Sequence, residues 1–157
     1  MKPARIFVCM SRHRIPGSAQ PRFSPREVPR QSLAAVVLDL DGVIYRGKTP
    51  IKGAPQAVAT LRERGLRVFF LTNNSTLARA DYVQRLGDFG LPCTKEEIYS
   101  SAYATALYLR ENGGNSKRAL VIGEGGLSQE LRKAGVKAIH KLEDTKVDYV
   151  VVGMDRK

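Results

Sequence analysis

The sequence predicts an α/β fold built around a parallel β-sheet, and three observations support this prediction. Short runs rich in Val, Leu and Ile alternate with segments whose apolar residues recur at helical spacing. The first of these runs is uninterrupted by polar residues, as expected for a strand that is buried on both faces. Glycines follow several of the helical segments, where a helix commonly ends. Such alternation favours parallel strands joined by right-handed crossovers.

The elements follow in order along the chain. The first strand begins at Ala34 and runs into two aspartates. A helix follows Gly53, has Pro55 in its first turn and ends at Gly65. The later elements are a strand at 66–71, a helix capped by Ser75 or Thr76 that packs through Tyr82, Val83 and Leu86, a short strand at Ile98, a helix at 102–110, a strand at 118–122, a helix with Leu127 and Leu131 on its buried face, and a strand at 147–152.

Composition limits the classes of function. A chain of 157 residues suits one domain, or one domain and part of another. The formal net charge is +11, but no basic stripe interleaved with aromatic residues follows residue 30, so we expect no nucleic-acid partner. No apolar run approaches the ~20 residues of a membrane span. The two cysteines, Cys9 and Cys93, fit a reducing compartment, and we expect a cytoplasmic protein.

Residues 1–33 differ from the rest in composition. The first 30 residues hold seven basic side chains against the single acid Glu27, and five prolines interrupt the segment. This composition predicts a disordered basic leader, because it offers little apolar surface to bury. Organellar transit peptides are also Arg-rich and acid-poor, so a transit peptide is the alternative.

Two carboxylates, Asp39 and Asp41, stand where the first strand ends. Ligands of open α/β sheets bind beyond the carboxyl ends of strands, and two crowded acids need a metal or a proton to offset their repulsion. A calcium loop of the EF-hand type is excluded, because Val43 and Pro50 occupy positions where it requires oxygen ligands. The pair therefore predicts a catalytic or metal-binding role.

A second polar cluster follows the strand at 66–71. Thr72 and Ser75 offer hydroxyls, and Asn73 and Asn74 offer amides. Taken alone, this segment is typical of a turn that precedes a helix. Consecutive strands of a βαβ unit are usually neighbours, so we expect the cluster to form an anion site beside the two acids. The glycine-rich stretch 123–126 lacks the spacing of a dinucleotide-binding loop and is interpreted as a turn.

These residues resemble the first two motifs of the haloacid dehalogenase superfamily. The stretch 39–47 (Asp-Leu-Asp-Gly-Val-Ile-Tyr-Arg-Gly) and the stretch 71–76 (Leu-Thr-Asn-Asn-Ser-Thr) are most similar to those of subclass IIA phosphatases, such as p-nitrophenyl, phosphoglycolate and pyridoxal phosphate phosphatases. The segments 98–107, 121–127 and 150–156 add support. The resemblance implies a Rossmann-like core, incomplete, at 34–99 and the first part of an α/β cap domain at 100–157.

The resemblance also implies a reaction on a small phosphorylated metabolite. Asp39 would be the nucleophile that forms an aspartyl phosphate, and Asp41 the general acid and then base. Mg2+ would bind the Asp39 carboxylate and the Asp41 backbone carbonyl. The substrate phosphoryl group would lie against Gly42 and the Thr72–Asn74 turn, and 42–53 would be a mobile flap. A full-length relative would form a homodimer through the cap domain.

The family pattern includes parts that this sequence does not supply after residue 76. These are a phosphate-binding lysine and a further acidic magnesium ligand, so we expect an N-terminal fragment that is nearly inactive alone. We also expect its interrupted sheet to leave an unmatched apolar face. Two other functions stay open: a non-catalytic interaction module, and a phosphoacceptor signalling domain. The second is disfavoured because no Asp ends the strand at 71.

Overall fold

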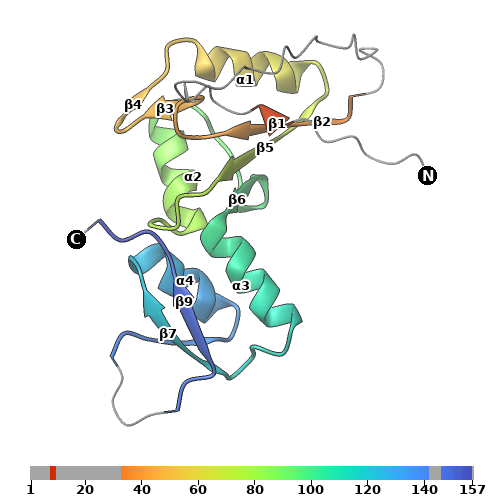
Figure 1. The fold of residues 1–157 in the computed structure, drawn as a ribbon. Helices are drawn as coiled ribbons and strands as arrows, with labels where there is room; N and C mark the ends of the chain where they lie inside the picture. The colour runs from red at the N-terminus through yellow and green to blue at the C-terminus, as the bar shows by residue number, and fades with distance from the viewer. Residues whose placement is uncertain (1–7, 10–32, 142–145, 157) are drawn as a thin grey trace, which may run out of the picture. The chain divides into compact units, whose positions relative to one another are not determined.

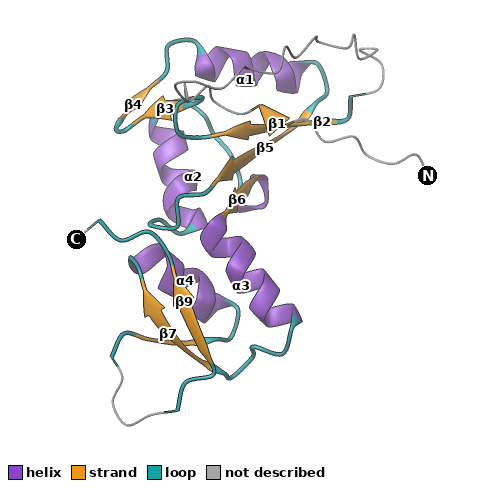
Figure 2. Cartoon of the chain, viewed as in Figure 1, coloured by secondary structure: helices purple, strands orange, loops and turns teal. Residues whose placement is uncertain are grey.

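The computed structural model describes residues 8–9, 33–141 and 146–156, with only the backbone described for residues 8–9. The chain divides into two compact units, the first ending at Phe69 and the second beginning at Phe70. From α1 (Ala54–Glu63) onward, helices and strands alternate along most of the chain, as the sequence predicts (Figures 1 and 2). No helix in these ranges combines the length and apolar character needed to cross a membrane. Most of the predicted leader lies outside the described residues.

The first unit is built around β2, the predicted first strand. A two-residue strand within the leader, β1, pairs with β2 in parallel, Val8 opposite Val37. Helix α1 begins after Gly53, whose φ of 86° suits glycine, and it buries Ala54 and Val58. The helical spacing of Ala54, Ala57 and Val58 predicts that they share a buried face, but Ala57 is exposed. The elements are β1 (Val8–Cys9), β2 (Ala35–Asp39), β3 (Tyr45–Arg46), β4 (Thr49–Pro50), α1 (Ala54–Glu63) and β5 (Arg67–Thr72), of which β5 continues into the second unit.

Strand β5 continues the sheet as expected. The strand order is β1-β2-β5-β6, where β6 is Ile98–Ser100. The N-terminal part of β5 lies in the first unit, where the Arg67 N–H donates to the Ala34 carbonyl at 3.2 Å. Its C-terminal part lies in the second unit and pairs in parallel with β6, Thr72 opposite Ser100. The prediction that the first two strands are neighbours is therefore confirmed.

The second unit adds a separate parallel sheet of order β8-β7-β9. In register, Leu120 of β7 lies opposite Ile139 of β8 and Val150 of β9. The sequence did not predict β8, which has only three residues. The elements of this unit after β5 are α2 (Arg79–Asp88), the 3-10 helix η2 (Lys95–Glu97), β6, α3 (Ser101–Glu111), β7 (Arg118–Ile122), α4 (Gly125–Lys133), β8 (Lys137–Ile139) and β9 (Tyr149–Val152).

Helices α3 and α4 cover one face of this sheet (Figure 1). Ala119, Val121 and Val151 point into the core between the sheet and the helices. The alternate residues face the other way, so Ile122 is 49% exposed and Val152 is 69% exposed. Among the described residues, this sheet therefore buries one face only. That the sheet of the predicted core leaves an unmatched apolar face stays a prediction.

The start of α2 corrects one prediction. Neither Ser75 nor Thr76 caps this helix: its N-cap is Ala78, and the Ala78 N–H donates to the Asp81 carboxylate at 2.9 Å. The prediction failed because the Ser75 and Thr76 hydroxyls form other hydrogen bonds, to the backbone of β9's carboxyl end and to Asn74. Ser and Thr compete for several local partners, so their presence alone does not fix a helix start.

Candidate active site

Asp39 and Asp41 lie at the carboxyl end of β2, as predicted. Asp39 is the last residue of the strand and is half-buried, and its Oδ1 accepts the Leu40 N–H at 2.8 Å. Within the described ranges, Oδ2 of Asp39 meets no hydrogen-bond donor. Asp41 is exposed. Both side chains therefore offer carboxylate oxygens to a ligand or a metal ion.

The loop after Asp41 is held by its own backbone. The Leu40 carbonyl accepts the N–H groups of Ile44 at 2.9 Å and Tyr45 at 3.2 Å, and the Gly42 N–H donates to the Tyr45 carbonyl at 2.7 Å. Gly42 has a φ of 85°, which only glycine adopts at little cost. The segment predicted as a flap contains the antiparallel hairpin β3–β4. Its mobility stays a prediction.

This loop leaves one further oxygen open. The backbone carbonyl of Asp41 accepts no hydrogen bond from any described residue. Carboxylate and carbonyl oxygens are the ligands that suit Mg2+, which usually completes its six positions with water and substrate oxygens. No cluster of three His, Cys, Asp or Glu side chains suited to a metal occurs in the described part of the chain. The donors fit Mg2+, and they would supply part of its coordination.

The turn from Thr72 to Thr76 belongs to the second unit and is tightly organised. The Thr72 hydroxyl accepts the Asn74 N–H at 3.1 Å. The Asn74 side-chain oxygen accepts both the N–H and the hydroxyl of Thr76, at 3.0 and 2.7 Å. Thr72, Ser75 and Thr76 are each less than 5% exposed. The turn is therefore a fixed structure that its own side chains build.

Two side chains outside the turn bind its carbonyl groups. The Ser101 hydroxyl donates to the Asn73 carbonyl at 2.8 Å, and the Tyr82 hydroxyl donates to the Asn74 carbonyl at 2.9 Å. The N–H groups of Asn73 and Ser75, in contrast, donate to no acceptor among the described residues. A turn whose carbonyls are occupied while N–H groups stay available can bind an anion.

The predicted site residues thus form two groups. Asp39, Asp41 and Gly42 lie together in the first unit, and the turn residues Thr72, Asn73 and Asn74 lie together in the second. That the two groups meet at one site stays a prediction. Sequence reasoning missed Tyr82 and Ser101 as hydrogen-bond donors to the turn, because their positions on α2 and α3 give no local signal of it.

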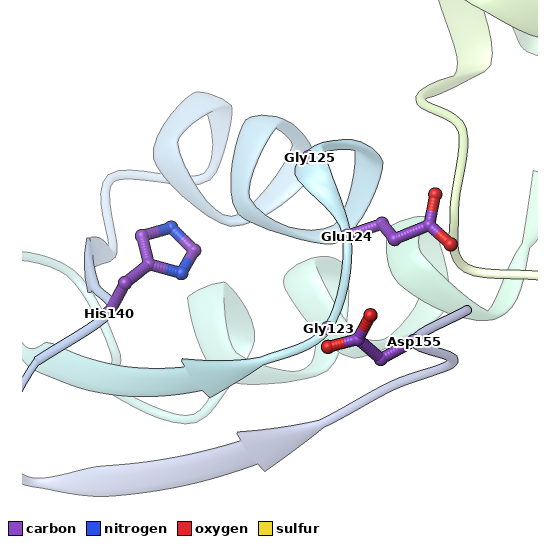
Figure 3. Close-up of a pocket in the computed structure, with 5 residues that line it drawn as sticks. All are labelled: Gly123, Glu124, Gly125, His140 and Asp155. Atoms are coloured by element: carbon purple, nitrogen blue, oxygen red, sulfur yellow. The ribbon is translucent and has the colours of Figure 1, made fainter. Parts of the chain in front are cut away.

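A pocket of about 300 Å3 lies within the second unit (Figure 3). It is lined by Gly123, Glu124, Gly125, His140 and Asp155, where β7, β8 and β9 end. Figure 3 shows His140 at one end, with Glu124 and Asp155 at the other. The His140 Nε2 atom lies 3.1 Å from the Ser128 hydroxyl, and the Glu124 carboxylate binds the Arg156 guanidinium at 2.7 and 2.8 Å. The Glu124 contact raises the pKa of Arg156.

The sequence can now be placed in a family. The haloacid dehalogenase-like hydrolase family matches residues 36–137, which include both aspartates, the turn and β7. The chain belongs to this family. The resemblance that the two motifs indicate is therefore confirmed, as is the α/β fold that it implies.

Named relatives of the chain are phosphatases. It is 40% identical to the glycerol-3-phosphate phosphatase of Homo sapiens over 111 residues, which cover 66% of the chain and 35% of that protein. It is 36% identical to the p-nitrophenyl phosphatase from Archaeoglobus fulgidus, with a TM-score of 0.71 over 79% of the chain and 46% of that structure. It is 27% identical to a glycerol phosphate phosphatase of Mycobacterium tuberculosis solved with magnesium, with a TM-score of 0.71 over 81% of the chain and 38% of that structure.

The chain spans between about a third and a half of the length of these relatives. The Mycobacterium tuberculosis enzyme has also been solved with calcium. Divalent metal binding therefore occurs among the structural relatives of this chain.

Proposed function

We propose that the chain carries the nucleophile and the phosphate-binding turn of a phosphomonoester hydrolase. The observation that carries this proposal is the open Oδ2 of Asp39 at the end of β2, in a chain of this family. Oδ2 attacks the substrate phosphorus, and the bond from phosphorus to the ester oxygen breaks. Asp41 gives its proton to the departing oxygen, which leaves as an alcohol.

The second half of the reaction regenerates the enzyme. Water attacks the phosphorus of the aspartyl phosphate and Asp41 takes a proton from that water. The bond from phosphorus to Asp39 Oδ2 breaks, which releases inorganic phosphate and the free carboxylate. The Asn73 N–H and the Thr72 and Asn74 side chains bind phosphoryl oxygens, as an anion site at the turn predicts. Mg2+, bound to Asp39 and the Asp41 carbonyl, would stabilise negative charge on the phosphoryl group.

The substrate that we propose is a small phosphorylated metabolite. The names of the relatives, glycerol-3-phosphate phosphatase and p-nitrophenyl phosphatase, support a phosphate monoester of this kind. A homodimer through the predicted cap domain is part of the same proposal, and the exposed apolar side chains around Val152 support it.

Turnover by this chain alone should be slow. Hydrolysis of phosphate monoesters requires rate enhancements of up to ~10²¹, and stabilisation by a metal ion supplies several kcal/mol of that. Among the described residues, no group of three His, Cys, Asp or Glu side chains could hold such an ion. We therefore expect release of p-nitrophenol from p-nitrophenyl phosphate to stay near background.

The nucleophile can be tested without turnover. Beryllium fluoride forms a stable analogue of a phosphorylated aspartate, and ¹⁹F NMR detects the bound fluoride. We expect bound signals from the chain with Mg2+, and none from Asp39→Asn. Asp88→Asn is the matched control, because it removes an exposed carboxylate that binds Gln84 on α2, and it should keep the signals.

Two results would count against the proposal. One is the absence of bound fluoride in the unmodified, folded chain. The other is a signal of unchanged strength in Asp39→Asn.

A further inference from the structure

The turn proposed to bind phosphate contacts the edge of the second sheet directly, through one side chain and one backbone carbonyl. The buried Ser75 hydroxyl accepts the Met154 N–H at 2.8 Å, although 79 residues separate the two in sequence. The Thr76 carbonyl accepts the Gly126 N–H at 3.1 Å. Both partners lie just beyond the carboxyl ends of strands in the second sheet. Met154 follows β9, and Gly126 is in the first turn of α4, the helix that follows β7.

Two glycines permit this close approach. A Cβ atom at Gly153 would lie 2.6 Å from the Ser75 hydroxyl oxygen and 2.8 Å from Leu127 Cδ2. A Cβ atom at Gly126 would overlap the backbone of Leu77. Neither residue has a positive φ, so their backbone conformations do not require glycine. Space against the turn is the physical reason for glycine at both positions.

We infer that Ser75 is a positioning residue, which fixes the phosphate-binding turn against the end of β9. Ser75 follows Asn74 and precedes Thr76, the two residues joined by the side-chain hydrogen bonds of the turn. Its hydroxyl adds a hydrogen bond to the segment that follows β9, outside the turn itself. Without it, the available N–H groups of Asn73 and Ser75 would lose part of their preorganisation, which is what makes an anion site strong.

The same contact makes the sheet edge responsive to the turn. The Met154 N–H has Ser75 as its acceptor, so a ligand that shifts the turn must also change the environment of this amide. The inference rests on the proposed function, because it assumes that phosphate binds at the turn. Its test therefore separates phosphate binding itself from the contribution of Ser75.

The first measurement uses the unmodified chain. Inorganic phosphate is titrated in the presence of Mg2+ while backbone amide signals are followed by ¹H–¹⁵N NMR. We expect the Asn73 and Met154 amides to shift with the same apparent Kd. Shifts at Asn73 without any change at Met154 would overturn the inference and leave the proposed function intact. If phosphate causes no shift at Asn73, both the proposed function and the inference about Ser75 are wrong.

Two variants then weaken the contact in different ways. Ser75→Ala removes the acceptor, and Gly153→Ala pushes the Ser75 hydroxyl away without removing any polar group of the turn. We expect each to raise the Kd for phosphate about fivefold, the effect of losing one typical hydrogen bond. In both variants, the chemical shift of the Asn73 amide before phosphate is added should also differ from that of the unmodified chain.

The controls match these changes elsewhere in the same unit. Ser128→Ala removes a serine that is also buried and bound to one side chain, His140. Gly87→Ala adds a Cβ to α2, where it meets no heavy atom within 4 Å. Both controls should bind phosphate as the unmodified chain does. Should Ser75→Ala lose no more affinity than Ser128→Ala at comparable thermal stability, Ser75 has a structural role only and the inference is wrong.

Discussion

At the scale of single residues, the turn depends on donors that come from neighbouring helices. Tyr82 is completely buried on α2, and its hydroxyl donates to the Asn74 carbonyl. Ser101 begins α3 and donates to the Asn73 carbonyl. The sequence predicts that the turn is polar and precedes a helix. It does not predict which helical residues bind its carbonyls, because such contacts depend on packing rather than on spacing.

The role of Tyr82 can be measured as stability. Tyr82→Phe keeps the buried ring but removes the hydroxyl, so the Asn74 carbonyl loses this hydrogen bond. We expect the free energy of unfolding to fall by about 1 kcal/mol in urea titrations. Tyr108→Phe, at a tyrosine that is 64% exposed, should change it by less than about 0.5 kcal/mol. Equal stability of the two variants would contradict the assigned hydrogen bond.

The two aspartates and the turn could be predicted from sequence because each follows an apolar strand directly. Polar residues at that position lie at the carboxyl edge of a parallel sheet whatever the details of packing. Ser75 and Gly126 could not be found in this way. Their contacts cross 79 and 50 residues of sequence, and nothing near either residue indicates the partner.

At the scale of elements, a buried ion pair joins the start of α2 to α4. Glu130 is 2% exposed, and its carboxylate accepts the Arg79 N–H at 2.8 Å and lies 3.5 Å from Arg79 Nε. The Arg79 guanidinium also lies 3.5 Å from the ring centre of Tyr103 on α3. One arginine therefore contacts two other helices of the second unit.

Loss of this pair should be costly. Glu130→Ala leaves the mostly buried Arg79 without its carboxylate, and we expect the free energy of unfolding to fall by about 3 kcal/mol. Chemical denaturation followed by circular dichroism measures this change. Glu63→Ala, at an exposed position at the end of α1, is the control and should have little effect. A small effect of Glu130→Ala would mean that the pair contributes little to stability.

A second electrostatic contact sets the start of β9 against β7. The Asp148 carboxylate accepts the Arg118 N–H at 2.9 Å and lies 3.6 Å from Lys117 Nζ. The Arg118 bond, assisted by Lys117 and Lys146, holds the pKa of Asp148 below its ordinary value of 3.8. Because the folded state favours the ionised form, this contribution is present above about pH 3.8 and is lost as the pH falls below it.

Asp148→Asn should therefore show a pH-dependent effect. We expect the variant to be less stable than the unmodified chain near pH 6, and the difference to shrink as the pH falls below about 3.8. Thermal unfolding at a series of pH values measures the two curves. A difference that stays constant across this range would show that ionised Asp148 does not favour the folded state.

Strand and helix positions were predictable to different degrees. The strand at 118–122 matches β7, since a run of apolar residues is bounded there by charge and glycine. Strand β8 and the hairpin β3–β4 were not predicted, because they have only two or three residues and such short strands carry little periodic pattern. They form because a neighbouring strand offers hydrogen bonds. That pairing depends on the tertiary structure and cannot be read from the local sequence.

At the scale of the whole molecule, one face of the β8-β7-β9 sheet exposes apolar side chains that no described residue covers. Ile122 and Val152 lie opposite each other in register, and Val150 is 60% exposed beside them. Contiguous apolar patches of this kind promote association or bind hydrophobic ligands. The solution behaviour of the chain should reflect this face.

The prediction concerns dye binding and self-association. We expect the chain to enhance the fluorescence of anilinonaphthalene sulfonate and to self-associate as its concentration rises. Val152→Lys should reduce both effects while the far-ultraviolet circular dichroism stays unchanged. Val151→Lys places the charge on the buried face of the same strand and should unfold the sheet. Dye binding that Val152→Lys leaves unaltered would place the accessible apolar surface elsewhere.

The lack of room at Gly126 has a consequence for how the gene can change. Any replacement there adds a carbon atom where the Leu77 main chain already lies, so every non-synonymous mutation of this codon forces the backbone apart. Codon 87 also encodes glycine, but its surroundings are open. Natural selection should therefore remove amino-acid variants at codon 126 and tolerate alanine at codon 87, a contrast that sequencing of many individuals would reveal.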